Sequence, residues 1–151
     1  MPSSEIPVTI SDWLTDEEQE VITERLRAFN LTHAGISWQA PEEARPVHLS
    51  ARDANGILVG GLVGETHAIP YWLNVSVLWV AEAVRGQGIG TALLRGAEQI
   101  ARRRSCQHAR ITTSHYQAPD FYAHHGYREY GRLDDFPPGE TVHYFCKRLI
   151  S

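Results

Sequence analysis

The chain has 151 residues, of which 42% are hydrophobic and 21% charged, with a net charge of −4. This length and composition predict one soluble globular domain spanning residues 1–151, with no segment able to cross a membrane. The first ten residues lack the basic and apolar segments of a secretory signal, so we expect a cytoplasmic protein, and the acidic balance favours a cationic partner over nucleic acid.

The N-terminal part predicts a strand followed by a helix. Apolar residues alternate over residues 6–10, which is typical of a strand. Thr15 and Glu18 form a capping box, and an apolar face at helical spacing follows, so we expect a helix that ends near Asn30. Residues 33–43 have no clear period and are interpreted as a loop or a short second helix.

The next stretch predicts three antiparallel strands. Residues 46–52 and 57–65 are the first two, because the turn sequence Asp-Ala-Asn-Gly at 53–56 lies between them. A second turn at 67–71 leads to a longer apolar strand at 72–80.

A long helix and a short strand follow. Residues 88–104 carry apolar side chains at helical spacing and end in three arginines, Arg102 to Arg104. Cations at that end complement the helix dipole, which explains the cluster without a nucleic-acid partner. Residues 110–113 predict a strand parallel to the previous one.

The last part predicts a short helix and two closing strands. We expect a helix at 119–125 with Gly126 as its C-cap, then strands at 127–130 and 142–149. The loop between these strands, at 134–139, contains two consecutive prolines.

The most informative motif joins the strand at 72–80 to the helix at 88–104. It reads Arg85-Gly86-Gln87-Gly88-Ile89-Gly90. Glycines allow close approach of a ligand, and the free N–H groups of a helix N-terminus favour an anion such as phosphate. The spacing excludes a Walker loop and a dinucleotide fingerprint and leaves the pattern Arg/Gln-x-x-Gly-x-Gly/Ala. The alternative is a glycine-rich helix start with no ligand.

This pattern resembles the cofactor motif of the GNAT acetyltransferase superfamily. A second motif, Ala118-Pro119-Asp120-Phe121-Tyr122 followed by Gly126-Tyr127, resembles the later motif of the same family in order and spacing. The resemblance covers nearly the whole second half of the chain. It implies a mixed α/β, α+β-like fold, with a central, mostly antiparallel twisted sheet of about six to seven strands flanked by about four helices.

The resemblance implies acetyl-CoA as donor and the primary amine of a small molecule as acceptor, with direct attack in a ternary complex and no metal. It also allows a homodimer. By this analogy the Val80 N–H polarises the thioester carbonyl. The residues that would bind the cofactor are Leu78, Trp79, Val80, Arg85, Gly86, Gln87, Gly88, Ile89, Gly90, Thr91 and Tyr122.

Tyr122 is the candidate general acid, because a phenol near the sulfur could protonate the departing thiolate. The alternative is a tyrosine that packs its helix on the sheet. His115 stands where many family members have an asparagine, and it could contact the cofactor, act on the acceptor amine or lie on the surface. Asn74 stands where some members have a glutamate base, so Glu65, and after it Glu82, are the remaining carboxylates considered for that role.

Other residue types carry weaker signals. The histidines show no metal-ligand spacing, and Cys106 and Cys146 are expected to be reduced thiols. The aromatic residues considered for the acceptor site are Trp38, Trp72, Trp79 and His33. Two other functions stay open at this point: a protein or peptide acetyltransferase, and a non-catalytic acyl-CoA-binding module.

Overall fold

The computed structural model describes residues 6–34, 44–68, 71–114 and 118–150. The chain divides into two compact units, residues 1–40 and 41–151, which are described separately. None of the described helices is long and apolar enough to cross a membrane.

The first unit contains the helix α1, Asp16–Ala34. The predicted capping box is confirmed, because the Glu18 backbone N–H donates to Thr15 Oγ1 at 3.1 Å and the Thr15 N–H donates to the Glu18 carboxylate at 2.8 Å. The helix continues four residues beyond the predicted end at Asn30. No glycine or proline interrupts the chain before Gly35, so nothing in the sequence stops the helix earlier.

The strand predicted at residues 6–10 is wrong. These residues have no regular secondary structure, and the described part of the first unit contains no other strand with which they could form a ladder. Alternating apolar side chains stabilise a strand only when its backbone groups find a partner. The segment predicted as a loop or second helix, including Trp38, falls mostly on residues 35–43, outside the described residues.

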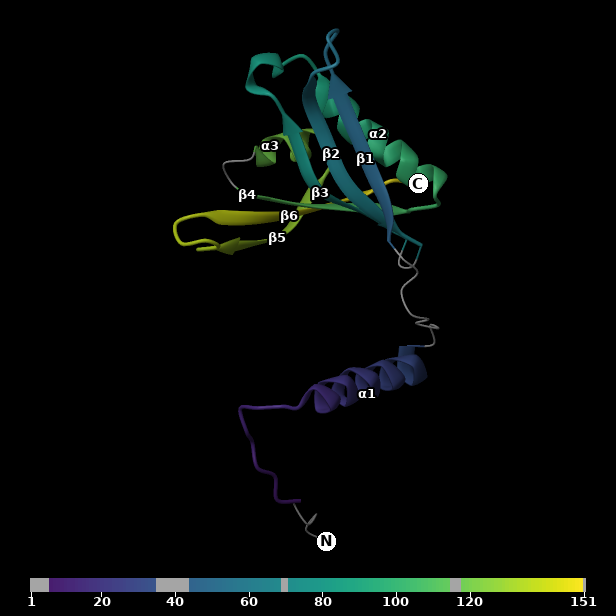
Figure 1. Cartoon of the computed structure of the whole chain (residues 1–151), viewed down its shortest axis with the longest axis vertical. Helices are drawn as coiled ribbons and strands as arrows, with labels where there is room; N and C mark the ends of the chain where they lie inside the picture. Colours follow the sequence, from purple (N-terminus) through teal and green to yellow (C-terminus); the bar gives the residue numbers. More distant parts are fainter. Residues whose placement is uncertain (1–5, 35–43, 69–70, 115–117, 151) are drawn as a thin grey trace. The chain divides into compact units, whose positions relative to one another are not determined.

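The second unit is built on a six-stranded sheet with the order β1-β2-β3-β4-β6-β5 (Figure 1). The strands are β1 Arg45–Arg52, β2 Leu58–His67, β3 Trp72–Val80, β4 His108–Ser114, β5 Arg128–Asp134 and β6 Thr141–Arg148. Only the β3–β4 pair is parallel. The predicted mixed α/β fold with a mostly antiparallel sheet is therefore confirmed.

Local turn chemistry explains the hairpin between β1 and β2. The Asp53 carboxylate accepts hydrogen bonds from the backbone N–H groups of Asn55 at 2.9 Å and Ile57 at 3.0 Å. Gly56 has a φ of +78°, a conformation that glycine adopts at little cost. The turn predicted at 53–56 is confirmed, whereas the next one includes residues 69–70, outside the described residues.

Two helices accompany the sheet, α2 Ile89–Arg103 and α3 Pro119–His124, and a short 3₁₀ helix, Glu82–Val84, precedes α2. With α1 they make three α-helices and one 3₁₀ helix in the described residues, close to the predicted number. Gly126 follows α3 with a φ of +86°, in agreement with its predicted role at the helix end. β5 runs further than the predicted strand at 127–130, because a register shift between Glu129 and Gly131 lets pairing with β6 continue to Asp134.

The core lies between α2 and the sheet. α2 buries one face, and the fully buried side chains around it include Leu62, Leu73, Leu94 and Ile111. The arginines at the C-terminal end of α2 form hydrogen bonds with backbone carbonyls of neighbouring segments. Arg102 Nε donates to the Leu149 carbonyl at 2.9 Å. Arg104 donates to the carbonyls of Arg45 and Pro46, which agrees with the structural interpretation of the arginine cluster. Both cysteines are free thiols.

Candidate functional site

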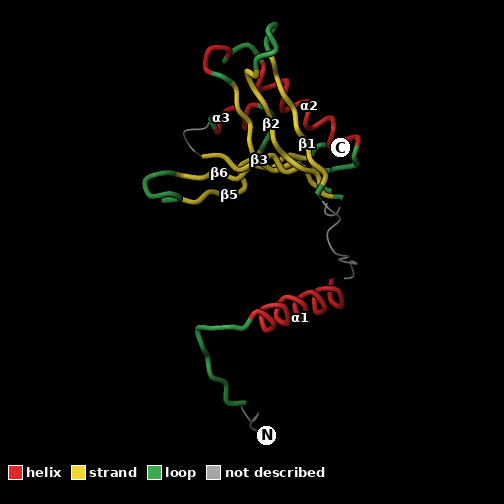
Figure 2. The backbone as a smooth tube through the Cα atoms, in the orientation of Figure 1, coloured by secondary structure: helices red, strands yellow, loops and turns green. Residues whose placement is uncertain are grey.

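The site begins where β3 and β4 separate. The two strands pair in parallel only from Trp72 to Val75 on β3 and from His108 to Ile111 on β4. Beyond this point β3 keeps its pairing with β2, while β4 pairs with β6, so the two halves of the sheet diverge (Figure 2). The separation opens a cleft between two strands that would otherwise share hydrogen bonds.

A β-bulge lies at the point of separation. Val63 pairs with Val77 and Gly64 with Val75, so Ser76 is an extra residue on β3. A Cβ at Gly64 would lie 2.6 Å from the Asn74 carbonyl oxygen, closer than such atoms normally approach. The bulge therefore needs glycine at position 64, and bulges bend the strand that carries them.

Beyond the bulge, backbone groups of β3 face the cleft. The Ala81 N–H donates to the Val59 carbonyl at 2.8 Å, on the β2 side. Successive residues of a strand direct their backbone groups to opposite sides, so those of Val80 and Leu78 point away from β2 and into the gap. The Val80 carbonyl accepts a hydrogen bond from Arg85 Nε at 3.1 Å, which is consistent with this direction.

The glycine motif leads directly into the N-terminus of α2. Gly86 and Gly88 have φ values of +79° and +83°, and Gly88 is the N-cap. The first helical hydrogen bond in this turn runs from Ala92 N–H to the Gly88 carbonyl, which leaves the N–H groups of residues 88–91 without partners inside the helix. The N-cap makes no side-chain hydrogen bond, so these donors and the helix dipole suit an anion.

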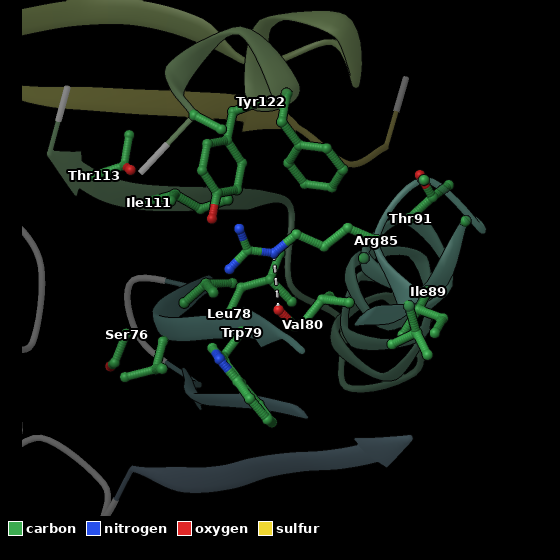
Figure 3. A pocket seen from close by; sticks show the side chains of 18 of the residues that line it. Ser76, Leu78, Trp79, Val80, Arg85, Ile89, Thr91, Ile111, Thr113 and Tyr122 are labelled. Atoms are coloured by element: carbon green, nitrogen blue, oxygen red, sulfur yellow. Dashed lines mark hydrogen bonds between the residues drawn. The ribbon is translucent and has the colours of Figure 1, made fainter. Parts of the chain in front are cut away.

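These parts enclose one cleft of about 730 Å³ (Figure 3). It is lined by Val75, Ser76, Val77, Leu78, Trp79, Val80, Val84, Arg85, Gly86, Gly88, Ile89, Gly90, Thr91, Ile111, Thr112, Thr113, Ala118, Phe121 and Tyr122. The lining includes every residue predicted to bind the cofactor except Gln87. A long ligand with amides at one end and phosphates at the other fits this arrangement, since strand groups without a partner strand and helix N–H donors lie along the same cleft.

Tyr122 brings a protonated hydroxyl to the cleft. The residue comes from α3 and is only 6% exposed, and its ring packs at 6.0 Å from that of Phe145. Figure 3 shows its hydroxyl directed into the cleft, toward the Arg85 guanidinium. Burial raises the pKa of Tyr122 to about 12, so the hydroxyl keeps its proton at neutral pH. The side chain thus packs its helix on the sheet and also presents a proton donor.

The carboxylates considered as bases lie outside the cleft lining. Glu65 on β2 lies 3.1 Å from His67 Nε2, and Glu82 is exposed on the 3₁₀ helix. The side-chain oxygen of Asn74 accepts a hydrogen bond from Arg110 Nε at 3.2 Å. His115 lies outside the described residues.

Of the aromatic residues considered for the acceptor site, only Trp79 lines the cleft among those described. In Figure 3 it lies across β3 from Tyr122. Trp72 stacks on His108, with ring centroids 4.7 Å apart. His33 belongs to α1 in the first unit.

Sequence reasoning missed the residues that β4 contributes, Ile111 to Thr113. The parallel pairing predicted for this strand was the available signal, because the partner of β3 must form the other wall of any gap beside it. The Thr91–His125 contact, at 3.0 Å, was also missed, since 34 residues separate the partners. Within the described part of the chain, no three His, Cys, Asp or Glu side chains are grouped to hold a metal.

Comparisons with known proteins agree with this geometry. The sequence matches the acetyltransferase (GNAT) domain family over residues 45–129. It is 42% identical over 111 residues to blasticidin-S acetyltransferase of Streptomyces morookaense, covering 71% of this chain and 80% of that protein. An acetyltransferase of Agrobacterium fabrum is 35% identical over 140 residues, covering 93% and 97% of the two chains.

A solved structure extends the similarity to the fold. The crystal structure of an acetyltransferase from Bacillus cereus superposes with a TM-score of 0.72 at 33% identity, covering 93% of this chain and 97% of the other. The family model, the two relatives and the solved structure are all acetyltransferases by their names. The chain belongs to the GNAT acetyltransferase family and is an acyltransferase of that family.

Proposed function

We propose that this protein transfers the acetyl group of acetyl-CoA to a primary amine of a small molecule, by direct attack in a ternary complex. The observation that carries the proposal is the divided sheet: the part of β3 that has no partner strand on the β4 side, the α2 N-terminus and the Tyr122 hydroxyl lie along one cleft. The small-molecule acceptor is supported by the relative from Streptomyces, whose name states that it acetylates blasticidin S.

The cofactor would be held at two places. The N–H groups of residues 88–91, with Gly86 and Arg85 beside them, would bind its diphosphate. Leu78 and Val80 would pair with its amides in the way a neighbouring strand does. The Val80 carbonyl already accepts one hydrogen bond from Arg85 Nε, and its second lone pair stays available to a ligand.

When bound, acetyl-CoA would supply a thioester whose carbonyl carbon is open to attack by an amine. The Val80 N–H would stabilise the negative charge that develops on the carbonyl oxygen. A C–N bond forms and the C–S bond breaks, and Tyr122 would donate its proton to the departing thiolate. Neither Asn74 nor Ser76 can accept the proton that the amine loses, so we propose that the acceptor reacts as the neutral amine and releases that proton to water.

Release of free CoA thiol, measured with a broad panel of amines and a lysine-containing peptide, tests this function. The proposal predicts release that depends on one class of small amine and not on the peptide. Release with the peptide alone would instead establish a peptide acetyltransferase. Binding of acetyl-CoA without release for any acceptor would point to a non-catalytic binding module.

A further inference from the structure

One polar contact at the cofactor cleft has no part in the scheme above. Thr91 lies in the first turn of α2 and lines the cleft, and its Oγ1 is 3.0 Å from Nε2 of His125. His125 caps the C-terminus of α3, so this contact joins the two helices beside the cleft. Phe121 packs edge-on against the imidazole, with centroids 4.5 Å apart, and holds the ring toward α2.

We propose that His125 is a positioning residue for the cofactor: it bonds the Thr91 hydroxyl so that this hydroxyl donates to a phosphate group of bound CoA, and it takes up a proton when that phosphate binds. The inference rests on the proposed use of acetyl-CoA. It adds a pair of side chains to the backbone donors of the glycine loop.

The direction of the hydrogen bonds explains why the pair suits a phosphate. A phosphate oxygen accepts hydrogen bonds and has few protons to give at neutral pH. When Nε2 lacks a proton, the Thr91 hydroxyl donates to the imidazole and is not free to donate elsewhere. When Nε2 carries a proton, the imidazole donates to Thr91 Oγ1, and the threonine proton can turn to a ligand.

The charges around His125 explain why binding and protonation would be coupled. Burial lowers the pKa of His125, and the positive charges of His124 on α3, Arg95 on α2 and Lys147 on β6 lower it further. The Glu98 carboxylate on α2 acts in the opposite direction. An anion bound beside Thr91 would offset these positive charges and favour the imidazolium.

This cationic surrounding contrasts with the chain as a whole, whose net charge is −4. Arg95 lies four residues after Thr91 on α2, so both side chains project from one face of the helix. A local excess of positive charge beside unpaired helix N–H groups is the setting in which a phosphate binds most readily.

The test measures the Kd of CoA by calorimetry between pH 5.5 and 8.5, for the wild type and for His125→Gln, Thr91→Val and His48→Gln. The glutamine at 125 can still bond Thr91 but does not titrate, so it supplies the baseline for the titration of the cofactor's own phosphate. His48→Gln is the matched control, because His48 is exposed on β1, outside the cleft lining, and is not among the charges that act on His125. The histidine signals, followed by NMR with and without CoA, report the pKa of His125 directly.

We expect wild-type binding to tighten on acidification by about tenfold more than that of His125→Gln, the change produced by a rise of one unit in the imidazole pKa. His48→Gln should behave as the wild type, and Thr91→Val should lose the extra pH dependence of the Kd. Dephospho-CoA identifies the phosphate: an unchanged pH dependence assigns the diphosphate, and its loss assigns the 3′-phosphate.

If the Kd of CoA depends on pH equally in the wild type and in His125→Gln, the inference is overturned and the proposed function stays intact. An unchanged His125 pKa on binding would have the same consequence. Failure of the wild type to bind CoA at any pH would overturn both the proposed function and this inference.

Discussion

The single residue on which most of the proposed chemistry depends is Tyr122. Its ring is buried among aromatic side chains, and its hydroxyl faces the cleft (Figure 3). The burial that raises its pKa to about 12 keeps it a proton donor throughout the physiological range.

Tyr122→Phe keeps the packing and removes only this donor. We expect kcat to fall by about 10²- to 10⁴-fold, because that is the usual contribution of a positioned acid. The Kd of acetyl-CoA should change little, since the proposed contacts with the cofactor come mostly from backbone groups. Tyr130→Phe, at an exposed tyrosine on β5, is the control and should keep full activity. A Tyr122→Phe enzyme with wild-type kcat would show that the thiolate leaves without this acid.

Gly64 is the residue on which the divided sheet depends. In Gly64→Ala the new Cβ would meet the Asn74 carbonyl oxygen at 2.6 Å, so the bulge at Ser76 must rearrange. We expect a loss of about 1 to 3 kcal/mol in the free energy of unfolding, together with weaker CoA binding. Gly131→Ala is the matched control, because a Cβ there has no neighbour within 4 Å. Chemical denaturation and calorimetry would measure both effects, and equal behaviour of the two variants would refute this role for Gly64.

Among the elements, α2 is tied to the sheet by a buried carboxylate. Glu98 is 3% exposed and accepts hydrogen bonds from the Tyr127 hydroxyl at 2.8 Å and from Lys147 Nζ at 3.0 Å. Arg102, one turn further along α2, lies 3.9 Å from the same carboxylate. The cluster joins the helix that follows the glycine motif to the start of β5 and to β6.

Glu98→Gln removes the charge but keeps the shape of the side chain. We expect it to lower the free energy of unfolding by about 2 to 3 kcal/mol, because a partly buried Lys147 loses its counter-charge. Glu24→Gln tests the contrast: Glu24 pairs with Arg27 on α1, both side chains are largely exposed, and the loss should stay below about 1 kcal/mol. Urea unfolding of both variants measures the difference. An unchanged free energy of unfolding in Glu98→Gln would mean that water solvates the Lys147 ammonium as well as the Glu98 carboxylate does.

The elements also show what sequence alone predicts. β3 and α2 agree with their predicted ranges to within a residue, because each has a clear period and a glycine or turn boundary. The turn at 53–56 could be predicted from its residue types alone, because Asp, Asn and Gly favour turns. The strand at 6–10 failed because pairing depends on a partner elsewhere in the chain, which local alternation does not report.

The site shows the same limit. The glycine loop and Tyr122 belong to sequence motifs, so both could be predicted from the sequence. The bulge at Ser76 and the requirement for Gly64 depend on the approach of two strands, which appears only when β2 and β3 are placed side by side. Contacts such as that of Thr91 with His125 join segments far apart in sequence, and no local pattern marks them.

For the whole molecule, the buried tyrosines predict weak stability at alkaline pH. An unfolded tyrosine loses its proton near pH 10, whereas folded Tyr122 keeps it up to about pH 12. Burial and the Glu98 carboxylate raise the pKa of Tyr127 as well. Above pH 10 the unfolded state therefore binds fewer protons, and the free energy of unfolding must fall as the pH rises.

Between pH 9 and 12 we expect Tyr122 alone to lower the free energy of unfolding by about 2 kcal/mol, and Tyr122→Phe to remove this part of the loss. Thermal unfolding followed across this range, for the wild type and Tyr122→Phe, checks the prediction. If the stability of the two proteins falls in parallel with pH, Tyr122 has the same pKa in the folded and the unfolded state.

The most direct test of the account is an NMR titration of the isotope-labelled protein with CoA. The account predicts that the largest amide shifts occur at Leu78, Val80 and residues 86–91, where backbone groups face the cleft, with little change at β1 and β5. Shifts concentrated away from β3 and the α2 N-terminus, or no shifts at saturating CoA, would contradict the claim that the divided sheet is the cofactor site.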